Sequence, residues 1–196
     1  MDDYTMKLKG FLNPEQLQPN LIVASVFIAV YENLKFSIVD NLRYFYFSGF
    51  DDGKKLFDNY EKQVLSKVVS KENRQMKATL LWLVEAGAIA EKDREKFKEL
   101  TNMRNLLSHD MTKMLFEGFP NNIYELYIDM IELFEKITKW WIAEIELPTN
   151  PDITSKQYDS IDLDGVTSVN LEFIRIMTDI ALTGTDKYLK MLDKEG

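Results

Sequence analysis

The chain has 196 residues, of which 45% are apolar and 29% are charged, so it is long enough to bury the core of one globular domain. It contains no cysteine, which excludes disulfides, thiolate zinc sites and thiol nucleophiles and fits a reducing cytoplasm. Its net charge of −8 argues against nucleic acid as a partner, provided that the charges are evenly spread.

The charges are not evenly spread. Residues 54–104 carry 12 Lys and Arg against 8 Asp and Glu, a local balance of +4. Residues 117–170 carry 3 basic residues against 11 acidic ones, a local balance of −8. Because phosphate groups respond to the local field and not to the total charge, a binding site for nucleic acid is still compatible with this chain.

The N-terminal part predicts an irregular arm followed by a long helix. Residues 1–19 contain Gly10, Pro14 and Pro19 and show no sustained periodicity, and they also lack the basic start of a secretion signal. Asn20 is a candidate N-cap for a helix over residues 21–47. The apolar run at the start of that helix covers eleven residues, fewer than the roughly 20 that a membrane span needs.

Further helices follow from apolar residues at helical spacing, and glycine, proline or polar residues separate them. They are predicted over residues 56–69, 74–90, 91–107 and 123–146. Residues 147–170 form an acidic loop with four aspartates, and residues 171–196 a C-terminal helix that packs on the bundle. The predicted fold is therefore all-α, an antiparallel up-and-down bundle of five or six helices.

The stretch with the most chemistry is Arg104-Asn105-Leu106-Leu107-Ser108-His109, which contains the one histidine of the chain. On a helix, Arg104 and His109 lie about 140° apart around the axis, so they converge on one target only if the helix ends near Ser108 or a second copy contributes. An arginine fork matches phosphate oxygens and an imidazole transfers protons near neutral pH. Together they suit metal-independent cleavage of RNA.

One structural interpretation of this stretch competes with the catalytic one, and two other kinds of site are excluded. A histidine near the end of a helix commonly caps the last carbonyl groups and has only a structural role. Adjacent Ser108, His109 and Asp110 cannot form the relay of a hydrolase triad. A single histidine also excludes a metal site built from several histidines, and no other motif for a metal or a cofactor is present.

The hexapeptide resembles the Rx4–6H motif of HEPN domains, which are all-α bundles found in prokaryotic toxin–antitoxin, abortive-infection and CRISPR-associated systems. A charged helix precedes it, and Asn105 directly follows the arginine. The stretch Tyr31-Glu32-Asn33-Leu34 in the first long helix is similar to the abortive-infection branch. The resemblance covers roughly residues 20–145, which makes residues 20–146 the HEPN-like bundle.

The resemblance implies that two copies of the chain dimerise with their motif helices facing each other and share one composite ribonuclease site. Arg104 then binds the scissile phosphate, His109 is the acid and base, and Asn105 is a polar positioning residue, while Ser108 joins Arg104 in substrate binding. No metal or cofactor is implied. One branch carries a tyrosine two positions after the histidine, where this chain has Met111.

The function expected from the sequence is that of a cytoplasmic, metal-independent endoribonuclease of a microbial defence or toxin–antitoxin system. The expected partners are RNA, a second copy of the chain and a cognate antitoxin or defence-system protein, and no membrane. The alternative is a HEPN-type module that binds or scaffolds RNA or nucleotides without turnover, an interpretation that the acidic C-terminal third favours. A helical bundle with no nucleic-acid role is the third alternative.

Overall fold

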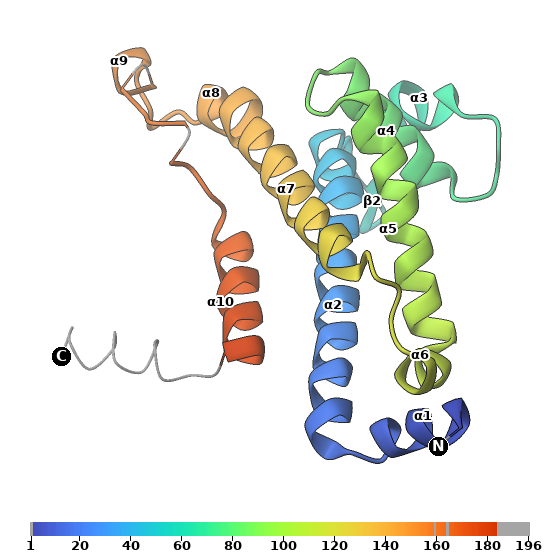
Figure 1. Cartoon of the computed structure of the whole chain (residues 1–196). Helices are drawn as coiled ribbons and strands as arrows, with labels where there is room; N and C mark the ends of the chain where they lie inside the picture. Colours follow the sequence, from blue (N-terminus) through green and yellow to red (C-terminus); the bar gives the residue numbers. More distant parts are fainter. Residues whose placement is uncertain (1, 159, 164, 184–196) are drawn as a thin grey trace.

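The computed structural model describes residues 2–158, 160–163 and 165–183. These residues are predominantly helical, which confirms the all-α fold class (Figure 1). The one sheet among them is a small hairpin of β1 (Gly49–Asp51) and β2 (Lys54–Leu56).

The N-terminal residues are helical, so the prediction of an irregular arm over residues 1–19 is wrong. Helix α1 covers Asp3–Phe11, and α2 begins at Pro14 and continues to Phe45. Asn13, and not Asn20, caps α2 by accepting a 3.1 Å hydrogen bond from the Glu15 amide. Proline at the first position of a helix costs no hydrogen bond, because the amide there would be free in any case.

Helix α2 is the one described helix long and apolar enough to cross a membrane, judged by length and composition alone. Its most apolar 18-residue window has a mean hydropathy of 1.6, and 44% of that window is buried within the fold. Core helices of globular proteins share these properties.

The segment after α2 turns back through the hairpin. Asp52 and Gly53 form its two-residue turn, and both have positive φ angles, 46° and 74°, as a type I′ turn requires. The single helix predicted over residues 56–69 is instead divided into α3 (Asp58–Gln63) and the 3₁₀ turn η1 (Leu65–Lys67). Helix α4 (Arg74–Glu85) follows after Asn73 in the left-handed conformation.

Helices α5 (Glu91–His109), α6 (Met111–Glu117) and α7 (Ile123–Trp141) follow, and α5 and α7 supply much of the main core. Helix α5 runs back along α2, so its C-terminal end and the short α6 lie near α1 (Figure 1). Helix α7 follows the turn at Gly118 and continues into the π-helical turn η2 (Ile142–Glu146) and α8 (Leu147–Thr149). The sequence did not predict α6.

The acidic segment after α7 contains the short α9 (Ser155–Tyr158) and then leads to α10 (Val169–Thr183). Helix α10 is fastened to α7 by a 2.7 Å hydrogen bond between the Tyr127 and Thr178 hydroxyls and by an ion pair between Arg175 and Glu135. The predicted C-terminal helix also included residues 184–196, which lie outside the described residues.

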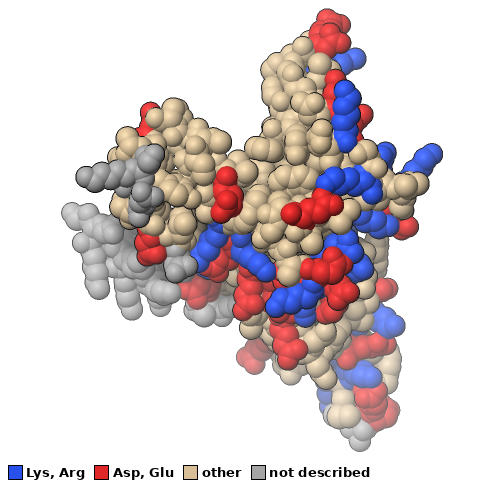
Figure 2. Space-filling view, turned by 90° about the horizontal axis from the view of Figure 1, so that it is seen from above, with Lys and Arg blue, Asp and Glu red and all other residues tan. Residues whose placement is uncertain are grey.

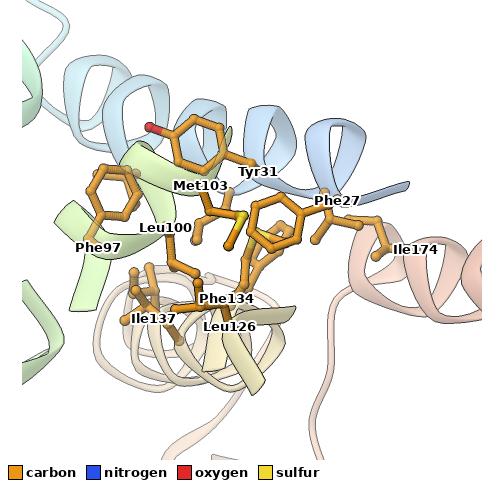
Figure 3. Close-up of a cluster of buried hydrophobic side chains, with 14 of the residues drawn as sticks. Phe27, Tyr31, Phe97, Leu100, Met103, Leu126, Phe134, Ile137 and Ile174 are labelled. Atoms are coloured by element: carbon orange, nitrogen blue, oxygen red, sulfur yellow. The ribbon is translucent and has the colours of Figure 1, made fainter. Parts of the chain in front are cut away.

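The main core lies between α2, α5, α7 and α10. The predicted apolar face of α5 is buried, as its spacing indicated: Phe97, Leu100, Met103 and Leu107. In Figure 3, Phe97 of α5 lies beside Tyr31 of α2, and Ile174 reaches in from α10. Each fully buried leucine of this kind contributes roughly 1.5–3 kcal/mol of transfer free energy. The buried face therefore holds α5, the helix with the hexapeptide, firmly against α2 and α7.

Candidate functional site

The hexapeptide occupies the last turns of α5, because the helix continues to His109 and Asp110 is its C-cap. Met103 and Leu107 of the same turns are buried, and this orientation directs Arg104 towards α2. His109 is exposed at the end of the helix. The helix therefore does not bend at Ser108, and one copy keeps Arg104 and His109 on different sides.

Arg104 is held by three groups. One terminal nitrogen donates to Glu32 of α2 and forms an ion pair with it, and the other donates to the Asn105 side-chain oxygen at 3.0 Å. The guanidinium carbon lies 5.7 Å from the centre of the Tyr31 ring, within cation–π distance. The remaining nitrogen, Nε, is buried and has no hydrogen-bond partner in the described part of the chain.

Tyr31 forms a rigid floor below Arg104. Its ring stacks on Phe97 with 5.6 Å between centroids, and its hydroxyl lies 2.9 Å from the Thr101 hydroxyl, which donates to the Phe97 carbonyl. Burial raises the pKa of Tyr31, and the hydrogen bond to Thr101 and the charge of Arg104 offset only part of the rise. Tyr31 is therefore a neutral support for Arg104.

Arg104 and Asn105 lie at one end of a cavity of about 710 Å³ between α2, α4 and α5. Its lining combines five cationic side chains with three amides and an apolar floor, and contains no carboxylate. The cations are Lys35, Lys77, Arg94, Lys98 and Arg104, and the amides are Asn73, Asn102 and Asn105. Its size lies in the range of small-molecule and substrate sites, roughly 300–1,000 Å³.

The cations differ in how they are compensated. Arg94 pairs with Glu91 at 2.5 Å, and Lys35 lies 3.8 Å from Glu32. Lys77 and Lys98 form no ion pair with any residue in the described ranges. The Nε of Arg94, like that of Arg104, is buried without a partner among the described residues. The cavity therefore has an excess of positive charge.

The structure places the predicted site residues in two groups. Arg104 and Asn105 line the cavity, whereas Ser108 and His109 are exposed beyond it, towards the end of α5. A single chain does not bring His109 to the cavity. Arg104 and His109 of one folded chain therefore remain about 140° apart around α5. Only a second copy could bring a histidine next to Arg104.

Glu32 and the four cavity cations other than Arg104 were not predicted as site residues. The local balance of +4 included Lys77, Arg94 and Lys98, but it could not show that they share one cavity. Lys35 and Glu32 lie on α2, about 70 residues before the motif, and only the packing of α2 against α5 brings them there. The stretch Tyr31–Leu34 was the available signal, because two of its residues contact Arg104.

No group of three or more His, Asp or Glu side chains that could hold a metal ion occurs among the described residues. No family model, characterised protein or solved structure matches the chain. The similarity to HEPN domains therefore rests on the residues of the motif and on the helical pattern around it.

Proposed function

We propose that two copies of this chain form a metal-independent endoribonuclease with a HEPN-like bundle, in the cytoplasm, as part of a microbial defence or toxin–antitoxin system. One observation carries the proposal: α5 holds Arg104 in a cavity lined by cations without carboxylates, and presents His109 on the exposed end of the same helix. A two-fold pairing of such helices brings two arginines and two histidines together.

In this site, the proton transfers are divided between the two histidines. One imidazole accepts the proton of the ribose 2′-hydroxyl while its oxygen forms a bond to the adjacent phosphorus. The bond from phosphorus to the 5′-oxygen breaks, and that oxygen takes a proton from the other, protonated imidazole. Arg104 stabilises the charge on the pentacovalent phosphate. The products are a 2′,3′-cyclic phosphate and a 5′-hydroxyl.

Three side chains support Arg104 and His109 in this proposal. Asn105 holds one terminal nitrogen of Arg104 and acts as a positioning residue. Glu32 holds the other terminal nitrogen, so the guanidinium is oriented before substrate arrives. Ser108 is exposed one helical turn after Arg104 and one residue before His109, and in this proposal it contacts the substrate.

A binding or scaffolding module without turnover is the second candidate, because one observation favours it. Glu32 already occupies a terminal nitrogen of Arg104, and His109 lies outside the cavity of its own chain. If the chain acts alone, it can hold phosphate groups but has no proton donor beside them.

The test is incubation of purified protein with RNA in EDTA, followed by analysis of the RNA ends. Wild type is expected to cut and to leave 2′,3′-cyclic phosphates. Arg104→Ala is expected to lower the rate about 10²–10³-fold, as loss of a charge-stabilising donor does, and His109→Ala about 10²–10⁴-fold. Lys92→Ala, on an exposed part of α5 outside the cavity, is the matched control.

Intact RNA with wild type, or equal cutting by the double variant Arg104→Ala/His109→Ala, contradicts the proposal. RNA binding without cutting supports the second candidate. Circular dichroism of each variant checks that α5 is still folded.

A further inference from the structure

We propose that the cavity between α2, α4 and α5 binds the sugar–phosphate backbone of single-stranded RNA next to the cleaved bond, through Lys77, Arg94 and Lys98. The choice of RNA rests on the proposed ribonuclease function. The anion site itself rests on the charges, amides and shape of the cavity.

The charges in the cavity select a ligand with several negative groups. Five cations line it, and Lys77 and Lys98 form no ion pair with any described residue. Like charges held close together repel, so an anion that enters relieves repulsion as well as gaining attraction.

The extent of the cavity favours a chain of phosphates over a single phosphorylated molecule. The α5 residues in its lining run from Arg94 to Asn105, a rise of roughly 16 Å at 1.5 Å per residue. Lys98 lies between these ends, and Lys77 reaches in from α4. The three cations of α5 are thus spread along the helix and do not converge on one point. The row that they form begins at Arg104, where the proposed function puts the scissile phosphate.

The apolar floor indicates that the backbone, and not the bases, is recognised. Proteins that grip bases of single strands stack them on exposed aromatic rings. Here Tyr31 and Phe97 stack on each other and are only 4% and 3% exposed. The polar groups that remain available are the cations and the amides of Asn73 and Asn102. Binding in the cavity should therefore depend little on base sequence.

The test measures binding of fluorescently labelled single-stranded oligo(U) and oligo(A) RNA in EDTA, in the His109→Ala background so that cleavage does not remove the ligand. Lys77→Gln/Lys98→Gln removes two exposed cations from the cavity. Lys62→Gln/Lys92→Gln removes two exposed cations from α3 and from α5 outside the cavity, with the same change in net charge.

The cavity variant should lose about 1.4 from the slope of log K against log salt, at 0.7 for each phosphate contact on a single strand, or about twentyfold in affinity at roughly 0.1 M salt. The control variant should change affinity by less than about twofold, because distant charges are screened. The two RNA sequences should bind with equal affinity.

Equal losses in the cavity and control variants overturn the inference, as does a strong preference for one base sequence. Inorganic triphosphate or ATP that binds as tightly as RNA and is lost in the same cavity variant overturns it in favour of a small-ligand pocket. If wild type cuts RNA and the cavity variant binds and cuts as well, the inference fails while the proposed function is supported. If RNA binds in the cavity but is never cut, the proposed function fails alone. If wild type does not bind RNA at all, both fail.

Discussion

Lysines lie along both sides of α5, but only those on one side are paired with carboxylates. On the side facing α7, Lys96 pairs with Asp129 at 2.9 Å and Lys136 of α7 pairs with Asp93 at 2.5 Å. On the side facing α4, Lys77 and Lys98 meet no carboxylate in the cavity lining. The same helix therefore has a neutralised side that joins two helices and a positive side that is open to a ligand. Pairing, more than the number of lysines, distinguishes a structural surface from a candidate site.

On the α7 side, the pKa shifts of Asp93 and Lys96 arise largely from their ion-pair partners. Burial raises the pKa of Asp93, but the hydrogen bonds from Lys136 and from the Ala90 amide together lower it by more. The pKa of Asp93 is therefore below its ordinary value. The hydrogen bond to Asp129 raises the pKa of Lys96. On the face of the molecule seen from above, basic and acidic side chains are interleaved (Figure 2).

The largest expected effect on RNA affinity comes from adding a carboxylate to the cavity, so that its lysines are paired like those on the α7 side. Asn102→Asp places a carboxylate in the cavity, one helical turn from Lys98. RNA affinity should fall about tenfold at low salt, because the new charge pairs with a lysine and repels phosphate. Asn102→Leu removes the amide without adding charge and should cost about twofold or less. If the two variants bind RNA equally well, charge in the cavity does not control binding.

A smaller effect of opposite sign is expected when the carboxylate beside the cavity loses its charge. Glu32→Gln frees a terminal nitrogen of Arg104, so RNA affinity should rise about threefold at low salt and the salt slope should steepen. Glu85→Gln is the matched control, because Glu85 pairs with Lys67 outside the cavity. A drop in affinity for Glu32→Gln would contradict this expectation, because it would mean that the orienting effect of Glu32 on Arg104 outweighs its masking of the charge.

The smallest effect concerns stability on the neutralised side. The folded pKa of Asp93 is lowered, so its ionised form contributes stability above the unfolded pKa of about 3.9, and this contribution is lost as the pH falls through the folded value. Asp93→Asn keeps an acceptor for the Ala90 amide and removes the charge. The free energy of unfolding should fall by about 1 kcal/mol or less at neutral pH.

Thermal unfolding of wild type and Asp93→Asn, followed by circular dichroism between neutral pH and pH 3, measures this difference. The two melting temperatures should converge as the pH falls below 4. A difference that persists unchanged at pH 3 would show that the ion pair with Lys136 is not its source.

The sequence predicted those parts of the fold that depend on one helix face. The apolar spacing of α5 and α7 identified buried residues such as Leu100 and Phe134 because each helix packs along a single stripe. The beginning of α2 was missed because Pro14 and Pro19 were interpreted as breaks. The pair Asn13-Pro14 is instead a helix start, in which the asparagine caps and proline is the first residue.

The hairpin had a readable signal in Asp52-Gly53, a dipeptide typical of two-residue turns. The site was predictable only in part. Arg104 and Asn105 could be found from their motif, but the cavity depends on where α2 and α4 lie against α5. That arrangement is tertiary, so Lys35 and Lys77 could not be connected with Arg104 by spacing along the chain.

The central claim is that α5 of two copies completes one site, and mixing wild-type with inactive subunits tests it most directly. Wild type is mixed with about a ninefold excess of His109→Ala under conditions that allow dimers to exchange, and RNA cleavage is measured in EDTA. Because the site uses both histidines, a mixed dimer is inactive, and random exchange leaves only about a tenth of the wild-type subunits paired with each other, so cleavage should fall to roughly a tenth of that of the same amount of wild type alone. If cleavage stays unchanged after full exchange, each copy acts without its partner and the composite site is wrong.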